Sequence, residues 1–295
     1  MRPAYQHKTL TLFFFPLLKR VSFVYLLLMK KKVPFLLPMI LFFNCSCTIV
    51  NNNSIIKKPP QEQFVKIYKK IDIKKCSKTK QTEKVKEEKK CETRSFVSTG
   101  SGLIIYLVDN YTTVLSAGHV CSSEGLIAKE DNNFTYEILK EEISVLNYKN
   151  KIFKAKVVLA EQGSETSADL CTLVVPKLKL HGLKPQLAMR EPRVGEDIYY
   201  MGAPVGIYHP PTVLIIKGVY SGKIDKYAAL AGIHAAPGAS GSVILSTDGK
   251  IYGVLFAVHP RFPSATVITS FSSTRNFLLR SKKFLEIVSL QSGGI

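Results

Sequence analysis

The chain has 295 residues, 46% of them hydrophobic, and a formal net charge of +19. This length and apolar content exclude a chain too small to bury a core, and they allow one or two domains. The charge is uneven, because residues 1–93 carry 20 Lys and Arg against 6 Asp and Glu, whereas residues 94–295 carry 21 against 16. The strongly basic character therefore belongs to the N-terminal third, and the remainder is only mildly cationic.

Residues 1–50 form an apolar leader. Its first two apolar runs, LTLFFFPLL and VSFVYLLLM, are shorter than the roughly 20 residues of a membrane span. Met29 offers an alternative start, since MKKK is followed by the apolar VPFLLPMILFF and then NCSC, as in an export signal. The leader predicts an exported or membrane-anchored, extracytoplasmic protein, with lipid attachment at Cys45 or Cys47, an uncleaved anchor and a cytoplasmic location as open alternatives.

Residues 51–93 are rich in Lys, Glu and Gln and poor in large apolar side chains. Such a composition predicts a disordered, basic, flexible tether that buries no core. Its lysines favour an anionic membrane surface or nucleic acid by charge alone. Nucleic acid is disfavoured as a partner, because the stretch lacks the interleaved aromatic residues of a base-stacking surface.

Residues 94–295 alternate short apolar runs with turn residues, a pattern typical of an all-β barrel or sandwich. The runs are sufficient for two small barrels, divided near residues 184–192. The predicted strands are 102–108, 112–117, 142–148, 152–160, 170–175, 196–202, 212–219, 225–234, 242–246, 251–258 and 266–270. The final segment, STRNFLLRSKKFLEIV, has apolar residues at helical spacing and predicts an α-helix packed on the second barrel.

A serine nucleophile is predicted within AAPGASGSVIL, where Ser240 lies between glycines 238 and 241. Glycines permit a sharp turn and the approach of a carbonyl to the N–H groups of Gly238 and Ser240, which are the expected oxyanion donors. A base is predicted at His119, which ends the strand-like TTVLSAGHV. An acid is predicted at Asp169, which opens the buried run of SADLCTLVV and would fix the histidine tautomer.

Four motifs give the chain a family resemblance: GSGLII leading to LSAGHV; ADLCTLVV; GEDIYYMGAPVG with VLIIKGVYSG; and GASGSVILSTDGKIYGVLFA. Together they resemble a trypsin-like serine peptidase of the chymotrypsin fold, and most closely the bacterial HtrA-type peptidase domain without PDZ modules. The resemblance implies two six-stranded antiparallel β-barrels with a C-terminal α-helix, and a serine endopeptidase acting on proteins or peptides through His119, Asp169 and Ser240. One departure is that Ser242 and Val243 follow Gly241 where the family has Gly-Pro.

The resemblance also locates the pocket for the substrate side chain that precedes the cleaved bond. Part of this pocket is expected from the residues just before and around Ser240, and no carboxylate occurs from Gly232 to Leu245 to pair with a basic substrate side chain. Cleavage after apolar or small residues is therefore expected rather than after Arg or Lys. An inactive, protease-like binding or scaffold module is the alternative function. The expected pocket residues are His234, Ala235, Leu255, Phe256 and Ala257.

The cysteines suggest no metal site, since the chain has no CxxC pair or His/Cys cluster, and no cofactor is implied. Cys76 and Cys91 are spaced to close a loop in an oxidising compartment, although sequence alone does not determine pairing. Cys121 and Cys171 follow the predicted base and acid by two residues each. They are expected to be buried thiols rather than a disulfide.

Overall fold

The computed structural model describes residues 56, 59–77, 90–108, 111–123, 134–163, 167–179, 182 and 184–292. Contacts divide the chain into two units, Met1–Asn53 and Ser54–Ile295, and every described residue lies in the second. The predicted leader, with Met29, Cys45 and Cys47, therefore lies outside the described residues. In the part of the chain that is described, no helix is both long and apolar enough to cross a membrane.

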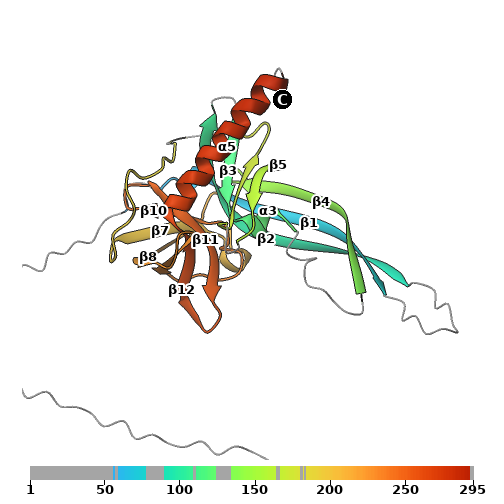
Figure 1. The fold of residues 1–295 in the computed structure, drawn as a ribbon, viewed down its shortest axis with the longest axis horizontal. Helices are drawn as coiled ribbons and strands as arrows, with labels where there is room; N and C mark the ends of the chain where they lie inside the picture. Colours follow the sequence, from blue (N-terminus) through green and yellow to red (C-terminus); the bar gives the residue numbers. More distant parts are fainter. Residues whose placement is uncertain are drawn as a thin grey trace, which may run out of the picture. The chain divides into compact units, whose positions relative to one another are not determined.

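The first six strands close into an antiparallel barrel in the order β1-β2-β3-β6-β5-β4 (Figure 1). Alternate side chains of a strand point to opposite faces, so each strand gives one set of apolar residues to the barrel interior. The six strands are β1 (Phe64–Ser77), β2 (Cys91–Val108), β3 (Tyr111–Ser116), β4 (Phe134–Asn147), β5 (Ile152–Glu161) and β6 (Leu170–Val174).

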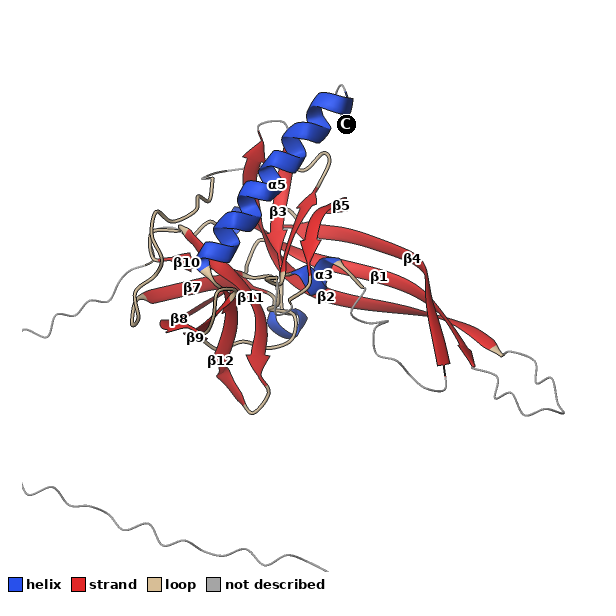
Figure 2. Ribbon diagram, in the orientation of Figure 1, coloured by secondary structure: helices blue, strands red, loops and turns tan. Residues whose placement is uncertain are grey.

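The next six strands close a second antiparallel barrel in the order β10-β11-β12-β9-β8-β7. The segment between β6 and β7 contains the predicted division at 184–192. Figure 2 shows the strand-dominated architecture, and the prediction of two six-stranded barrels with a C-terminal helix is confirmed. The strands are β7 (Asp197–Gly202), β8 (Leu214–Lys223), β9 (Ala228–Gly232), β10 (Val243–Ser246), β11 (Ile251–His259) and β12 (Phe262–Thr269).

The prediction of a disordered tether over residues 51–93 was wrong for the part that forms β1. Residues 64–77 form a full strand between β2 and β4, with Phe64, Val65, Ile67 and Ile71 buried. Successive side chains point to opposite faces, and the inward face holds Val65, Ile67 and Ile71 together with the buried Lys69, so the lysine-rich average composition hides a mostly apolar face. The domain therefore begins before residue 94, and β1 belongs to it.

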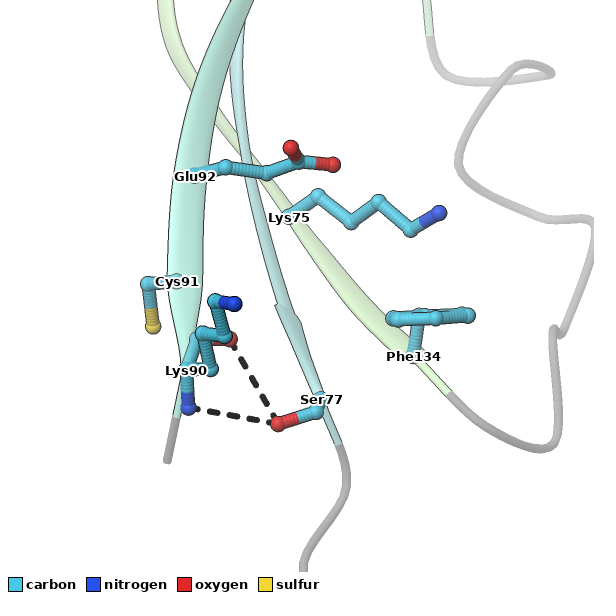
Figure 3. A pocket seen from close by; sticks show the side chains of 6 residues that line it. All are labelled: Lys75, Ser77, Lys90, Cys91, Glu92 and Phe134. Atoms are coloured by element: carbon cyan, nitrogen blue, oxygen red, sulfur yellow. Dashed lines mark hydrogen bonds between the residues drawn. The ribbon is translucent and has the colours of Figure 1, made fainter. Parts of the chain in front are cut away.

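Strands β1, β2 and β4 continue side by side beyond the remaining strands of the first barrel (Figure 1). A disulfide joins Cys76 to Cys91 where β1 and β2 reach the end of this extension. A small pocket lies at the same end, where the Lys75 ammonium lies 3.7 Å from the centre of the Phe134 ring (Figure 3). The pocket is lined by Lys75, Ser77, Lys90, Cys91, Glu92 and Phe134.

The C-terminal helix α5 (Phe271–Ser292) follows β12 directly. Its buried Phe277, Leu278 and Leu285 lie on the face that packs against strands. The Thr172 hydroxyl on β6 donates to the Ser281 hydroxyl on α5 over 3.2 Å. The helix contacts β2, β5 and β6 of the first barrel as well as β11 of the second. The expectation that it packs on the second barrel was therefore incomplete, because the helix connects both.

Candidate active site

His119 lies on α3 (Gly118–Cys121), a single helical turn that follows β3. Its ring nitrogen Nδ1 lies 2.6 Å from Oδ2 of Asp169, and its backbone N–H donates to Oδ1 of the same carboxylate over 2.8 Å. Strands β3 and β6 pair with Ser116 opposite Cys171, which brings the residues that follow β3 beside those that precede β6. The register of the sheet therefore creates the His–Asp pair.

The pair has the geometry that a general base requires. A carboxylate only accepts hydrogen bonds, so Nδ1 of His119 is the donor and Nε2 keeps its lone pair. The Asp169 side chain is 9% exposed and that of His119 is 44% exposed. The acid is thus held inside while the ring faces solvent. A Cβ on Gly118 would overlap the carbonyl of Glu161 and approach Asp169 Oδ1 to 2.8 Å, so the residue before His119 must be glycine.

Ser240 lies on the tight turn that leads into β10. Gly238 and Gly241 have φ values of +94° and +88°, a backbone region that glycine adopts readily. Hydrogen bonds of 2.9 Å from Ala239 N to Ala236 O and of 2.7 Å from Gly241 N to Leu255 O fix the turn. The turn leaves Ser240 partly exposed between two buried neighbours.

The N–H groups of Gly238 and Ser240 differ from those around them. Ala239, Gly241 and Ser242 all donate their N–H to backbone carbonyls. Among the described residues, no acceptor is bonded to the N–H of Gly238 or of Ser240. These are the two N–H groups that the sequence predicted for an oxyanion site, and both are available to a ligand.

Ser101, on β2 of the first barrel, connects the two barrels at this turn. Its backbone N–H donates to Ser240 O over 2.8 Å, and its hydroxyl donates to Gly238 O over 2.8 Å. The same hydroxyl accepts the N–H of Ala203 over 3.0 Å, and the Ser116 hydroxyl donates to Ser101 O over 2.8 Å. Ser101 is fully buried. In the sequence, Ser101 is marked only by its place in the GSGLII motif, which gives no sign of a link between barrels.

Close backbone approach places the Ser240 turn next to the segment that carries His119. A Cβ on Gly100 would meet Val120 at 2.6 Å and Ser240 O at 3.2 Å, and one on Gly241 would overlap the Ser116 hydroxyl. In the described part of the chain, the contacts that connect Ser240 to these surroundings are made by its backbone. The structure thus joins His119 and Asp169 through their side chains, and it brings Ser240 to the same junction through the main chain.

Of the five predicted pocket residues, two precede the Ser240 turn in the chain and three lie on β11. His234 is exposed and its carbonyl accepts the Tyr200 hydroxyl over 2.8 Å, whereas Ala235 is buried. Leu255 is buried and exchanges two hydrogen bonds with the turn, from Gly241 N and to Ser242 O. Its neighbours on β11 are Phe256 and Ala257, which are both partly buried.

Cys121 and Cys171 form a disulfide, so the expectation of free thiols was wrong. Both sulfurs are buried, and the bond connects α3 to β6. The pairing follows from the same β3–β6 register that joins His119 to Asp169, a non-local contact that the spacing along the chain does not reveal. The residues described contain no group of three or more His, Cys, Asp and Glu side chains that could hold a metal ion.

The family model of the trypsin-like peptidase domain matches residues 100–254, which is more than half of the 295 residues. A search of curated proteins finds no significant match.

Solved structures resemble the fold. The active form of Rv3671c protease from M. tuberculosis has a TM-score of 0.50 and 18% identity, and the match covers 75% of this chain and 81% of that one. A serine endoprotease from Yersinia pestis has a TM-score of 0.51 and 14% identity, with coverage of 77% of this chain and 65% of that one. At these identities the likeness concerns the fold.

Two closed six-stranded antiparallel barrels followed by a C-terminal helix are the fold of chymotrypsin-like serine peptidases. The chain belongs to the trypsin-like peptidase family, since the family model matches more than half of it. It is accordingly a serine endopeptidase, a hydrolase of peptide bonds, and its substrates are proteins or peptides.

Proposed function

We propose that Ser240, His119 and Asp169 form the catalytic triad of this endopeptidase. The observation that carries the proposal is the 2.6 Å contact between His119 Nδ1 and Asp169 Oδ2, with Nε2 left free to act as a base. The second support is the pair of unbonded N–H groups at Gly238 and Ser240. A nucleophile, an oriented base and oxyanion donors are the parts that acyl transfer requires.

In the proposed reaction, Ser240 Oγ attacks the scissile carbonyl and passes its proton to His119 Nε2. The N–H groups of Gly238 and Ser240 stabilise the oxyanion. Breaking the C–N bond transfers that proton to the leaving amine and leaves an ester on Ser240. Water then attacks the ester with His119 again as base, which releases the acid and restores the serine. Asp169 keeps the ring in one tautomer throughout.

The test is labelling by a fluorophosphonate, located by mass spectrometry, together with hydrolysis of casein. The wild-type protein should be labelled at Ser240, and Ser240→Ala and His119→Ala should lose roughly 10³-fold or more of the hydrolysis rate. Two exposed residues provide matched controls, Ser272→Ala and His259→Ala, which should behave as wild type. A folded wild-type protein that is neither labelled nor active would instead be the inactive scaffold considered from sequence.

We further propose that the enzyme cleaves after apolar or small residues. The support is the set of residues beside the nucleophile turn: Ala235, Leu255, Phe256 and Ala257 are uncharged, and His234 is the titratable member. A buried Arg or Lys side chain without a carboxylate partner would be costly to desolvate. Profiling with a peptide library tests this, and a profile dominated by Arg or Lys at the cleaved position would refute it.

The proposed location is outside the cytoplasm, by export through or anchoring at the leader. Its support within the described residues is the two disulfides, Cys76–Cys91 and Cys121–Cys171, since disulfides persist in oxidising compartments. Cell fractionation, with the mass of the mature N-terminus, tests the proposal. Recovery in the cytosol with an intact leader and reduced cysteines would contradict it.

A further inference from the structure

Lys69 is a buried cation that the triad chemistry does not use. It lies on β1, its residue is 2% exposed, and it shares the inward face of the strand with Val65, Ile67 and Ile71. Its ammonium donates to the carbonyl oxygen of His119 over 2.9 Å and to that of Ser122 over 2.7 Å. A strand outside the family match at 100–254 thus contacts the main chain of the proposed base.

The hydrogen bonds from Lys69 satisfy backbone carbonyls in and next to α3. The last carbonyls of a helix have no intrahelical partner, and an ammonium group with three donors can bind two carbonyls at once. Cations are also favoured at the C-terminal end of a helix, where the carbonyl dipoles point. The Ser122 N–H bonds to Gly118 O over 2.9 Å, so the turn is closed by the main chain and capped by Lys69.

Among the residues that the structure describes, the acidic group that acts on Lys69 is Glu141. Glu141 on β4 accepts the Ser123 hydroxyl over 2.8 Å and attracts the ammonium electrostatically. Burial lowers the pKa of Lys69, and Glu141 acts in the opposite direction. Strands β1 and β4 are paired with Ile71 opposite Glu141 and Lys69 opposite Ile143, so both anchors of residues 119–123 come from this strand pair.

We propose that Lys69 is a positioning residue for His119: by binding the His119 and Ser122 carbonyls it fixes the α3 turn, and hence the direction in which the imidazole faces Ser240. The proposal rests on the proposed catalytic role of His119. Asp169 holds the ring and the N–H of His119 from one side, and Lys69 holds its carbonyl from the other. Loss of Lys69 removes the side-chain hydrogen bonds to the His119 and Ser122 carbonyls.

The test compares three substitutions in the full chain. Lys69→Met removes the charge and the donors, Lys69→Gln keeps a donor without the charge, and Lys69→Arg keeps both. Lys70→Met, an exposed lysine on the next position of β1, is the matched control. We expect kcat and the rate of fluorophosphonate labelling to fall about 10- to 100-fold in Lys69→Met, because small misplacements of a catalytic group cost that much. KM should stay within about twofold, Lys69→Gln should be intermediate, and Lys69→Arg should recover most of the rate.

A spectroscopic readout separates positioning from folding. The Nδ1–H proton of His119, assigned by its loss in His119→Ala, should shift or broaden in the proton NMR spectrum of Lys69→Met and stay in place in Lys70→Met. If Lys69→Met does not fold, the same comparison is made with Lys69→Gln. Wild-type rates and an unmoved resonance in a folded Lys69 variant would overturn the proposal. If the wild-type protein is itself not labelled, the proposed function fails instead, and the resonance still decides whether Lys69 positions His119.

Discussion

The backbone N–H of Ser101 donates to the carbonyl oxygen of Ser240 over 2.8 Å, which ties a strand of the first barrel to the turn that carries the proposed nucleophile. The Ser101 hydroxyl extends this link, since it bonds Gly238 O and Ala203 N at the same time. Gly238 is where the proposed oxyanion site begins, so the position of its peptide groups depends on a side chain from the other barrel.

Ser101→Ala should therefore impair activity, although the substitution removes only one hydroxyl group. The substitution keeps the backbone bond to Ser240 and leaves Gly238 O and Ala203 N without their partner, at a cost of about 1–3 kcal/mol for such buried groups. We expect a lower unfolding midpoint and a fall of at least tenfold in labelling rate if the oxyanion donors move. Ser98→Ala, at an exposed position of the same strand, is the control. Equal labelling by the two variants would show that the hydroxyl is dispensable.

Asp169→Asn should lower kcat by roughly 10⁴-fold while the protein stays folded. Asp169 accepts from both the His119 ring and the His119 N–H, and an asparagine amide replaces one acceptor by a donor. The ring would then have to reverse its tautomer or break the contact. Hydrolysis and labelling rates measure the loss, and circular dichroism checks the fold. A decrease below tenfold would argue against a tautomer-fixing role.

A chain that begins at Arg94 should not fold, whereas one that begins at Asn51 should fold and be labelled. The shorter chain lacks β1 with its buried Phe64, Val65, Ile67 and Ile71. At about 1.5–3 kcal/mol for each buried side chain, their loss is comparable with the roughly 5–15 kcal/mol stability of a whole domain. Circular dichroism during thermal unfolding tests this. Cooperative unfolding of the Arg94 chain, together with labelling, would mean that β1 is dispensable.

The stability of the protein should decline in alkali because several tyrosines are buried. Burial raises the pKa of Tyr199 and Tyr220 to about 12, and Glu191 adds to the effect on Tyr220. Burial also raises the pKa of Tyr200. The folded state holds these protons more tightly than the unfolded state, so the stabilisation is complete below the unfolded pKa near 10 and is lost as pH rises toward 12.

Urea unfolding at a series of pH values from about 9 to about 11.5 measures this decline. In the folded protein, the phenolate absorbance should show some tyrosines ionising about two pH units above the usual value near 10. In guanidinium, all of them should ionise near pH 10. A single transition near pH 10 in the folded protein would contradict the burial of Tyr199 and Tyr200.

The sequence by itself determined most of the barrel strands from 102 onward and the closing helix, and it singled out His119, Asp169, Gly238 and Ser240 as candidate site residues. These features depend on neighbours within about ten residues, either as alternating apolar positions or as small residues around one polar side chain. Such patterns are visible in the chain before it folds. The family resemblance added the expectation that the strands form two barrels and that His119, Asp169 and Ser240 act together.

Only the tertiary structure decided what the N-terminal basic stretch and the cysteines do. Strand β1 gains its stability by pairing with β2 and with β4, about 70 residues away, so its lysine-rich composition gave the wrong prediction. The Cys121–Cys171 bond, the capping of His119 by Lys69 and the Ser101 link between barrels likewise join positions far apart in sequence. The register of the strands sets which distant residues meet, and register is fixed by the whole barrel rather than by any one segment.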